Sequence, residues 1–498
     1  MKTCFLCVDC GTTIVKAAVI DEELNILSEA SRPVAVKSPF HGANESDMLD
    51  VWSRFCEVTK ELKEKCPRFD DVAGLGVTGQ GDGLWPIDAH GEPVGNALLW
   101  NDTRSRDIDF DSMPEVADII EKNHSNLVFA GSMCALLKWL KLNQPERFSK
   151  IHKAIHCKDW INYRLTGEIY TDRSDGSSCV YDHVKGRFLT EVFEAADMNE
   201  CRDMLPEFSE SSGVIGRVSA KAARETGIRE GLPVIGGLID VCAVAVGADA
   251  FLPGRSSTII GTTLSCQMSY RKEALDFADK RGLYVHHAMP HNYLYILPTL
   301  SGASTMDYVK ALLFPDVKYP ALERELEKLP IGCEGLIYHP YISGERAPIK
   351  NPMATGGFFG LTQRHTKGHI MRSVFEGLAC SFYDCYQVFS GGYDTIYLSG
   401  GASISPMVCR LFTDMIGVPC RRVEAKELGT LGIARLLMVG LGLAGDFADF
   451  GEQKAASFQP DLQRHEEYLK VYQLFKQLQT MMEPFWKNRN DYITGGHR

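Results

Sequence analysis

The stretches Cys7–Ile20 (CVDCGTTIVKAAVI) and Ser257–Ser269 (STIIGTTLSCQMS) share a Gly-Thr-Thr centre between two β-rich arms. This pattern predicts two strands joined by a tight polar turn. Glycine followed by hydroxyl residues exposes backbone N–H groups, which can bind phosphate oxygens. A single turn of this kind is more typical of an ordinary hairpin, but two copies facing each other across a cleft would hold a polyphosphate. The predicted phosphate-binding residues are therefore Gly11, Thr12, Thr13, Gly261, Thr262 and Thr263.

The chain around the two turns repeats the same order of elements. Three strands are expected within residues 4–36, followed by a helix over 45–66 with Ser46 as its N-cap. In the second half, a hairpin over 254–269 precedes two more strands and a long helix over 366–389. Internal repetition of strands followed by helices is typical of a duplicated α/β domain.

The boundary between the halves is expected at the loop 247–254, GADAFLPG, where Gly and Pro separate a helix from the second hairpin. A chain of 498 residues is also too long for a single core. We therefore predict an α/β protein with an N-terminal domain over 1–248, a C-terminal domain over 249–498 and a cleft between them.

The overall charge and the length of the apolar segments indicate which classes of partner this protein does not bind. A formal net charge of −11 argues against a nucleic-acid surface, which needs clustered Lys and Arg. Asp9 interrupts the apolar N-terminal run, so no signal peptide is expected, and no apolar run approaches the roughly 20 residues that cross a bilayer. We expect a cytoplasmic protein with no nucleic-acid or membrane partner, and leave open whether it forms a homodimer.

Three of the sixteen cysteines lie close together and raise the question of a zinc site. Cys4, Cys7 and Cys10 fall in a predicted strand, where alternate side chains point to opposite faces, so Cys7 would face away from the other two. No second pair at close spacing supplies the missing ligands. We expect these cysteines to be small buried hydrophobic residues.

Asp9 distinguishes the first Gly-Thr-Thr turn from the second, which Ile259 and Ile260 precede. A carboxylate beside a phosphate is repulsive unless a cation lies between them. Mg²⁺ is commonly held by one or two carboxylates together with phosphates. Asp9 is therefore a predicted metal ligand, and an Asx-type turn residue is the alternative.

Further motifs, in the same order along the chain, make it similar to the FGGY family of carbohydrate kinases. Besides the two turns, they are GGLIDVCAVAVGA (236–248), GGFFGLTQRHTKGHIMRSVFEG (356–377), YLSGGASISPMVCRLFTDMIGVP (397–419) and EAKELGTLGIA (424–434). The resemblance implies the two-domain ATPase fold of actin and hexokinase, which is ribonuclease H-like. It also implies ATP and Mg²⁺ as cofactors, and a small sugar or polyol as the acceptor.

Asp240 is the candidate catalytic base. It ends the expected strand LPVIGGLI and begins the segment VCAVAVGA, an edge position suited to facing a cleft. The sequence alone leaves open a second role, that of a helix N-cap. The resemblance implies the catalytic role, in which Asp240 also contacts the sugar.

The sugar-binding candidates lie in two nearby segments. Gln80, Gly81 and Asp82 occupy the glycine-rich loop GQGDG, where amide and carboxylate groups can bind hydroxyls, although a polar surface loop is the alternative. Asp102 and Arg104 follow a predicted strand, in a region that lines or supports the sugar pocket of the family. For Arg104, a structural ion pair is an equal alternative. Trp85 (WPID) is either an apolar wall for the sugar or a core residue.

The adenosine-binding candidates lie in the turn SGGAS between a predicted strand and a predicted helix. Glycines there would let the nucleotide approach the backbone closely. Gly400, Gly401 and Ser403 are the expected contacts, and Gly429 and Gly432 are candidates for the opposite wall.

The resemblance to the family limits the choice of sugar substrate only in part. The chain carries Gly81-Asp82 where D-xylulose kinases typically carry Met-His, and Leu136 where the family usually has Lys. The overall organisation resembles L-xylulose kinases, whereas VTGQGDGLW (77–85) and HCKDW (156–160) resemble erythritol kinases. We expect a kinase acting on a primary hydroxyl of a pentulose such as L-xylulose, with erythritol as the alternative. A non-enzymatic sugar-responsive regulator and a filament-forming actin relative are rivals from other classes.

Overall fold

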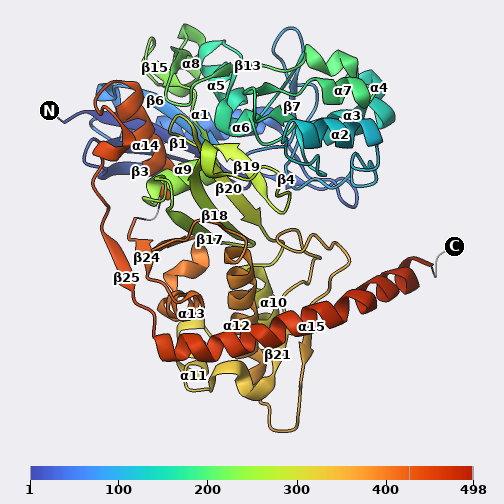
Figure 1. Ribbon diagram of the computed structural model, residues 1–498. Coiled ribbons are helices and arrows are strands. Elements are labelled where there is room, and N and C mark those ends of the chain that lie inside the picture. The colour runs from blue at the N-terminus through green and yellow to red at the C-terminus, as the bar shows by residue number, and fades with distance from the viewer. Residues whose placement is uncertain (1, 426, 496–498) are drawn as a thin grey trace.

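The computed structural model describes residues 2–425 and 427–495 and contains two seven-stranded sheets flanked by helices (Figure 1). The first sheet has the order β14 (Val214–Arg217), β15 (Pro233–Ile235), β6 (Leu75–Gly79), β1 (Cys4–Cys10), β2 (Ile14–Asp21), β3 (Ile26–Pro33), with β16 (Leu238–Ile239) beside β6. The second has the order β19 (Leu283–His286), β20 (Asn292–Pro298), β18 (Leu264–Arg271), β17 (Ser256–Ile260), β23 (Ile396–Ser399), β24 (Cys420–Val423), β25 (Ala455–Phe458).

The two sheets are built alike around the Gly-Thr-Thr turns. β1 pairs antiparallel with β2 and parallel with β6, and β17 pairs antiparallel with β18 and parallel with β23. Each turn therefore lies at the end of a central strand, where parallel neighbours also end. The prediction of a duplicated α/β fold is confirmed.

The main helices pack against these sheets or against other helices. They are α1 (Met48–Lys65), α2 (Pro114–Lys122), α3 (Met133–Asn143), α5 (Cys157–Thr166), α8 (Ala220–Thr226), α9 (Asp240–Gly247), α10 (Ala303–Leu313), α11 (Tyr319–Leu326), α12 (Lys367–Tyr386), α13 (Pro406–Ile416), α14 (Leu428–Gly440) and α15 (Leu462–Gly495). No helix within the described ranges 2–425 and 427–495 is both long and apolar enough to span a bilayer.

Helix α14 crosses between the halves of the chain. In sequence it lies between β24 and β25 of the second sheet, but it packs on α9, β1 and β6, and Figure 1 shows it beside the first sheet. One buried apolar cluster accordingly joins Phe5 and Cys7 of the first sheet to Leu294 and Tyr397 of the second. The domain limits at 248 and 249 stay a prediction.

The first helix begins one residue later than expected. Ser46 is buried in the short strand β5 (Glu45–Ser46), which pairs on both sides with other strands. Asp47 is the N-cap, and its carboxylate accepts the backbone N–H of Leu49 at 3.0 Å. The prediction of Ser46 as N-cap was wrong, because Ser46 is paired in a strand on both sides and the helix begins one residue later, where the Asp47 carboxylate caps it.

Candidate active site

The two Gly-Thr-Thr turns are braced differently by the surrounding protein. In the first turn, the Thr12 hydroxyl donates to Gln80 Oε1 at 3.1 Å and accepts from Trp100 Nε1 at 3.1 Å. In the second, the backbone N–H of Ala303, at the start of α10, donates to the Gly261 carbonyl at 2.8 Å. Both turns are therefore held from outside their own hairpins, which positions them before a ligand arrives.

Neither turn glycine, Gly11 or Gly261, has a positive φ. At Gly261 an added Cβ would meet only the Thr263 carbonyl oxygen, at 3.6 Å, an ordinary contact. Glycine is therefore not demanded by the backbone at this position. Because Gly261 has no side chain, the space beside it stays open, and Gly261 lines two neighbouring cavities.

A cavity of about 240 Å³ lies between the two sheets and brings several predicted residues together. The first half of the chain contributes Gly81, Asp82, Trp100, Phe129, Ser178 and Asp240, and the second contributes Gly261, Thr263, Ser265, Pro298 and Arg346. Carboxylates thus face a phosphate-type turn across a largely apolar pocket. Such a pocket, with a few convergent polar groups, is typical of a small-molecule site.

Asp240 is the first residue of α9, and Ile239 holds the N-cap position without a side-chain bond. The N-cap alternative for Asp240 therefore does not apply. Its Oδ1 accepts the backbone N–H of Val241 at 2.7 Å. Burial raises the pKa of Asp240 to about 7, and the Asp9 charge adds to the rise. A carboxylate with a pKa near neutrality is suited to accept a proton.

Asp82 stands in the same cavity with a positive φ of 55°, a conformation that Asp and Asn tolerate better than most residues. Its Oδ1 accepts a hydrogen bond from the Ser178 hydroxyl at 2.7 Å. Burial raises its pKa. At Gly81, an added Cβ would lie 2.1 Å from the Ile239 side chain, so the loop needs glycine to pack there.

Asp9 is the next-to-last residue of β1 and lies close to the N-terminus of α14. An added Cβ on Gly429 would lie 3.1 Å from the Asp9 carboxylate. Burial raises the pKa of Asp9 to about 6, while the neighbouring Lys16, which binds Glu427 at 3.0 Å, opposes this shift. Asp9 and Asp240 are both half-buried, and the Asp9 charge raises the pKa of Asp240, so a divalent cation held by Asp9 would reduce the negative charge of this region.

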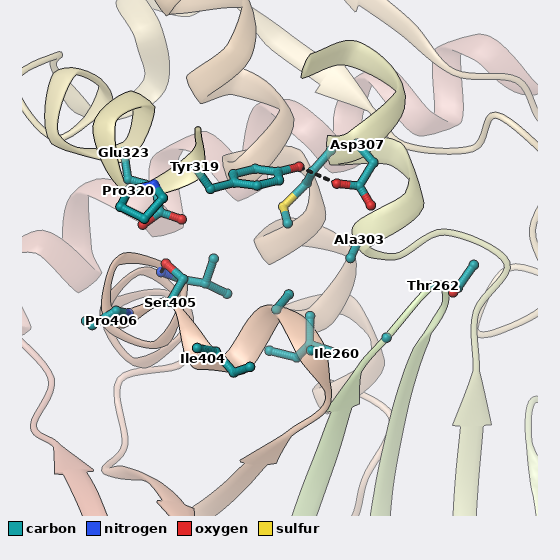
Figure 2. A pocket seen from close by; sticks show the side chains of 15 residues that line it. Ile260, Thr262, Ala303, Asp307, Tyr319, Pro320, Glu323, Ile404, Ser405 and Pro406 are labelled. Carbon is teal, nitrogen blue, oxygen red and sulfur yellow. Dashed lines mark hydrogen bonds between the residues drawn. The ribbon is translucent and has the colours of Figure 1, made fainter. Parts of the chain in front are cut away.

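A second cavity, of about 650 Å³, adjoins the first at Gly261. Figure 2 shows its walls, formed by Ala303, Tyr319, Pro320, Ile404 and Pro406, with the Tyr319 hydroxyl donating to Asp307 at 2.6 Å. Its walls are mostly apolar and suit a flat base. The cavity is large enough for a nucleoside.

The adenosine candidates divide between this cavity and its support. Gly401 lines it. Gly400 has a φ of 85°, and the buried Ser403 hydroxyl donates to its carbonyl at 2.7 Å. Gly429 and Gly432 do not line the cavity, because they lie where α14 approaches Asp9 and α9. The structure also brings in residues of α10 and α11 that no sequence pattern connected to this turn.

Asp102 and Arg104 do not line the cavity between the sheets. Arg104 Nη2 lies 2.8 Å from Asp102 and 2.7 Å from Glu45, and both Asp102 and Arg104 are buried. The Arg104 guanidinium also faces the ring of Trp139 at 4.9 Å. This is the structural ion pair that was the alternative for Arg104. Trp85 is fully buried in the core, and Trp100 takes the position of the aromatic wall.

A cluster of buried charged side chains lies next to the GQGDG loop, on the side of Gly81. Lys158 Nζ lies 2.5 Å from Asp159, 2.9 Å from Asp172 and 3.3 Å from Asp175, and an added Cβ on Gly81 would be 3.4 Å from Asp175. The segment HCKDW therefore forms part of this cluster. The Lys158 ammonium offsets part of the negative charge of these three carboxylates.

Comparisons with known proteins agree with this geometry. Residues 4–247 match the N-terminal domain, and residues 299–441 the C-terminal domain, of the FGGY family of carbohydrate kinases. A probable L-xylulose kinase from Haemophilus influenzae is 26% identical, over 87% of this chain and 90% of that protein. An erythritol kinase from Brucella abortus is 27% identical over 96% of each chain. The crystal structure of a xylulose kinase from Rhodospirillum rubrum has a TM-score of 0.87 and 26% identity, covering 97% of this chain and 100% of that one.

Proposed function

Because the chain belongs to the FGGY family of carbohydrate kinases and is an ATP-dependent sugar kinase, we propose that it phosphorylates a primary hydroxyl of a pentulose such as L-xylulose. The observation that carries this proposal is the cavity in which Asp82 and Asp240 face Gly261 and Thr263. A sugar bound at the carboxylates would present its hydroxyl toward a nucleotide bound at the second cavity. The two cavities share Gly261, where the transferred phosphoryl group would lie.

In the proposed reaction, Asp240 accepts the proton of the sugar hydroxyl while the oxygen attacks the γ-phosphorus. The bond between the γ-phosphorus and the bridging oxygen breaks, and ADP leaves. Asp9 would hold Mg²⁺, which neutralises phosphate charge when bound. The Gly-Thr-Thr turns and Gly401 would hold the nucleotide, and Asp82 with Gly81 would hold the sugar. Gln80 acts indirectly, by fixing Thr12.

A panel of ketoses and polyols, tested for ADP release from ATP, checks the proposal. L-xylulose should give the highest kcat/KM, and D-xylulose and erythritol should give lower values. Erythritol as the best substrate would favour the alternative, which HCKDW and the Brucella abortus relative support. A protein that binds a sugar but releases no ADP with any of them would favour a sugar-responsive regulator.

We expect kcat/KM to fall as the pH drops below about 7. The pKa of Asp240 is raised to about 7, so the carboxylate is protonated below that pH and cannot accept the sugar proton. The rate should fall about tenfold per pH unit on the acid side and level off above pH 7. The residual activity of Asp240→Asn is measured over the same pH range as a control. Because this variant lacks the titrating carboxylate, its pH dependence shows the effect of the titration of ATP itself. An acid limb with a midpoint near pH 4 would contradict this assignment.

Replacing Asp82 by Asn should change the choice among sugars. A carboxylate only accepts hydrogen bonds, whereas the amide also donates, and Asn tolerates the positive φ at this position. We expect the ratio of kcat/KM for L-xylulose to that for erythritol to change by about tenfold, with ATP affinity unchanged. Asp107→Asn, at a side chain that is 91% exposed, is the matched control. Unchanged ratios would mean that Asp82 does not select the sugar.

A further inference from the structure

Arg346 carries a guanidinium group whose hydrogen-bonding capacity is largely unused. It lies in the loop between β21 (Ile337–His339) and β22 (Gly357–Phe359) and lines the cavity between the sheets. Its Nε is buried and has no hydrogen-bond partner among the described residues. Its Nη2 makes only a long contact, 3.4 Å, with the Thr299 carbonyl. A buried donor of this kind costs free energy unless a ligand satisfies it.

The neighbouring carboxylate does not satisfy Arg346. Glu345 Oε1 accepts the backbone N–H of Leu300 at 2.6 Å and that of Arg346 itself at 2.9 Å. Within the described ranges 2–425 and 427–495, no carboxylate oxygen lies within 4.0 Å of the Arg346 side-chain nitrogens. Loop packing alone therefore does not explain why an arginine stands here.

The surroundings of Arg346 place it at the sugar end of the cavity. Its guanidinium carbon lies 5.8 Å from the centroid of the Trp100 ring, and Asp82 lines the same cavity. Trp100 in turn donates to Thr12 of the first turn. Arg346 belongs to the second half of the chain, whereas Trp100 and Asp82 belong to the first. It therefore reaches across the cavity toward the residues proposed to hold the sugar.

We infer that Arg346 binds an acceptor-only oxygen of the substrate, opposite Asp82. Arginine only donates hydrogen bonds and an ionised Asp82 only accepts them, so the pair matches a substrate with a hydroxyl next to a keto or carboxylate oxygen. A ketose supplies the keto oxygen, and an aldonate would supply the carboxylate. A polyol has only hydroxyls, which donate as well as accept and can turn to other partners. This role rests on the proposed kinase function and deepens it by naming the substrate feature that is recognised.

Arg346→Met tests the inference, since methionine keeps an apolar stem of similar width and removes every donor. The sugars are L-xylulose, D-xylulose, erythritol and gluconate. Arg346→Lys restores the charge without the planar fork and should recover part of the loss. Arg489→Met, at an exposed position of α15, is the control. ATP and ADP affinities are measured by calorimetry, and folding by the melting temperature.

We expect Arg346→Met to raise KM for the preferred ketose roughly 10–50-fold, since a hydrogen bond from a charged group is lost. KM for erythritol should change much less, and ATP affinity not at all. If the wild type prefers gluconate and Arg346→Met raises KM selectively for gluconate, the substrate oxygen bound by Arg346 is a carboxylate oxygen. This result would also support the inference. An equal loss for ketose and polyol, an unchanged KM, or a loss of ADP affinity would overturn it. Wild-type protein that phosphorylates erythritol and no ketose would contradict the pentulose proposal instead.

Discussion

Asp240→Asn should lower kcat by about 10²–10⁴-fold, the usual contribution of a general base. The amide keeps the size of the carboxylate and the acceptor oxygen that bonds the Val241 N–H at 2.7 Å, but it cannot take the sugar proton. Because Asp240 is the first residue of α9 and not its N-cap, the replacement removes no capping hydrogen bond from the helix. Steady-state measurement of ADP formation with saturating sugar and ATP gives kcat directly.

For Asp240→Asn, the expected decrease must be a decrease in kcat. The variant must also fold and bind nucleotide as the wild type does. The melting temperature should not decrease, because burial of an ionised carboxylate disfavours the charged form and the amide removes that cost. ATP affinity, measured by calorimetry, should stay within about twofold because Asp240 does not line the nucleotide cavity. Turnover close to that of the wild type would rule out Asp240 as the base.

Gly261→Val should weaken ATP binding by roughly 100-fold or more, because its side chain would occupy the space where the two cavities meet. The glycine has no positive φ, and a Cβ there makes only an ordinary contact at 3.6 Å. The variant should therefore fold normally, which separates binding from stability. Calorimetric titration with ATP and with ADP provides the measurement.

Gly451→Val is a matched control for this variant, since an added Cβ at Gly451 meets no atom within 4 Å and its φ is not positive. It should leave nucleotide affinity unchanged. If Gly261→Val binds ATP as tightly as the wild type, the second turn does not hold the phosphates. If it loses the fold together with binding, the space at Gly261 has a packing role that its surroundings do not show.

The local elements of this protein were predictable because short-range chemistry decides them. Alternating apolar residues around a Gly-Thr-Thr turn specify a hairpin, and both hairpins were expected within a residue or two of β1 with β2 and of β17 with β18. The repetition of this unit indicated the duplicated fold. The placement of Asp240 at the junction of a strand and a helix also followed from the local pattern.

Partners that are distant along the chain could not be predicted in the same way. Arg104 pairs with Glu45, α14 packs on the first sheet, and Ser46 stays in a strand because of pairing with residues far from it. No period or spacing in the sequence encodes such contacts, since they depend on how whole elements pack. For this reason the sequence left open whether Arg104 contacts the sugar or forms an ion pair, and it offered Gly429 as a candidate for the adenosine wall. The structure places Arg104 in an ion pair and Gly429 beside Asp9.

The sequence by itself determined the two hairpin turns, the repeated α/β order and the carboxylates at strand ends, because neighbouring residues set those features. Only the tertiary structure decided which of these side chains share a cavity. It brought Arg346 beside Trp100 and across from Asp82, although the loop around Arg346 shows no periodic pattern. The physical reason is that this binding site forms where the two sheets meet, and their relative position is set by packing of the whole core, including the buried cluster that joins them.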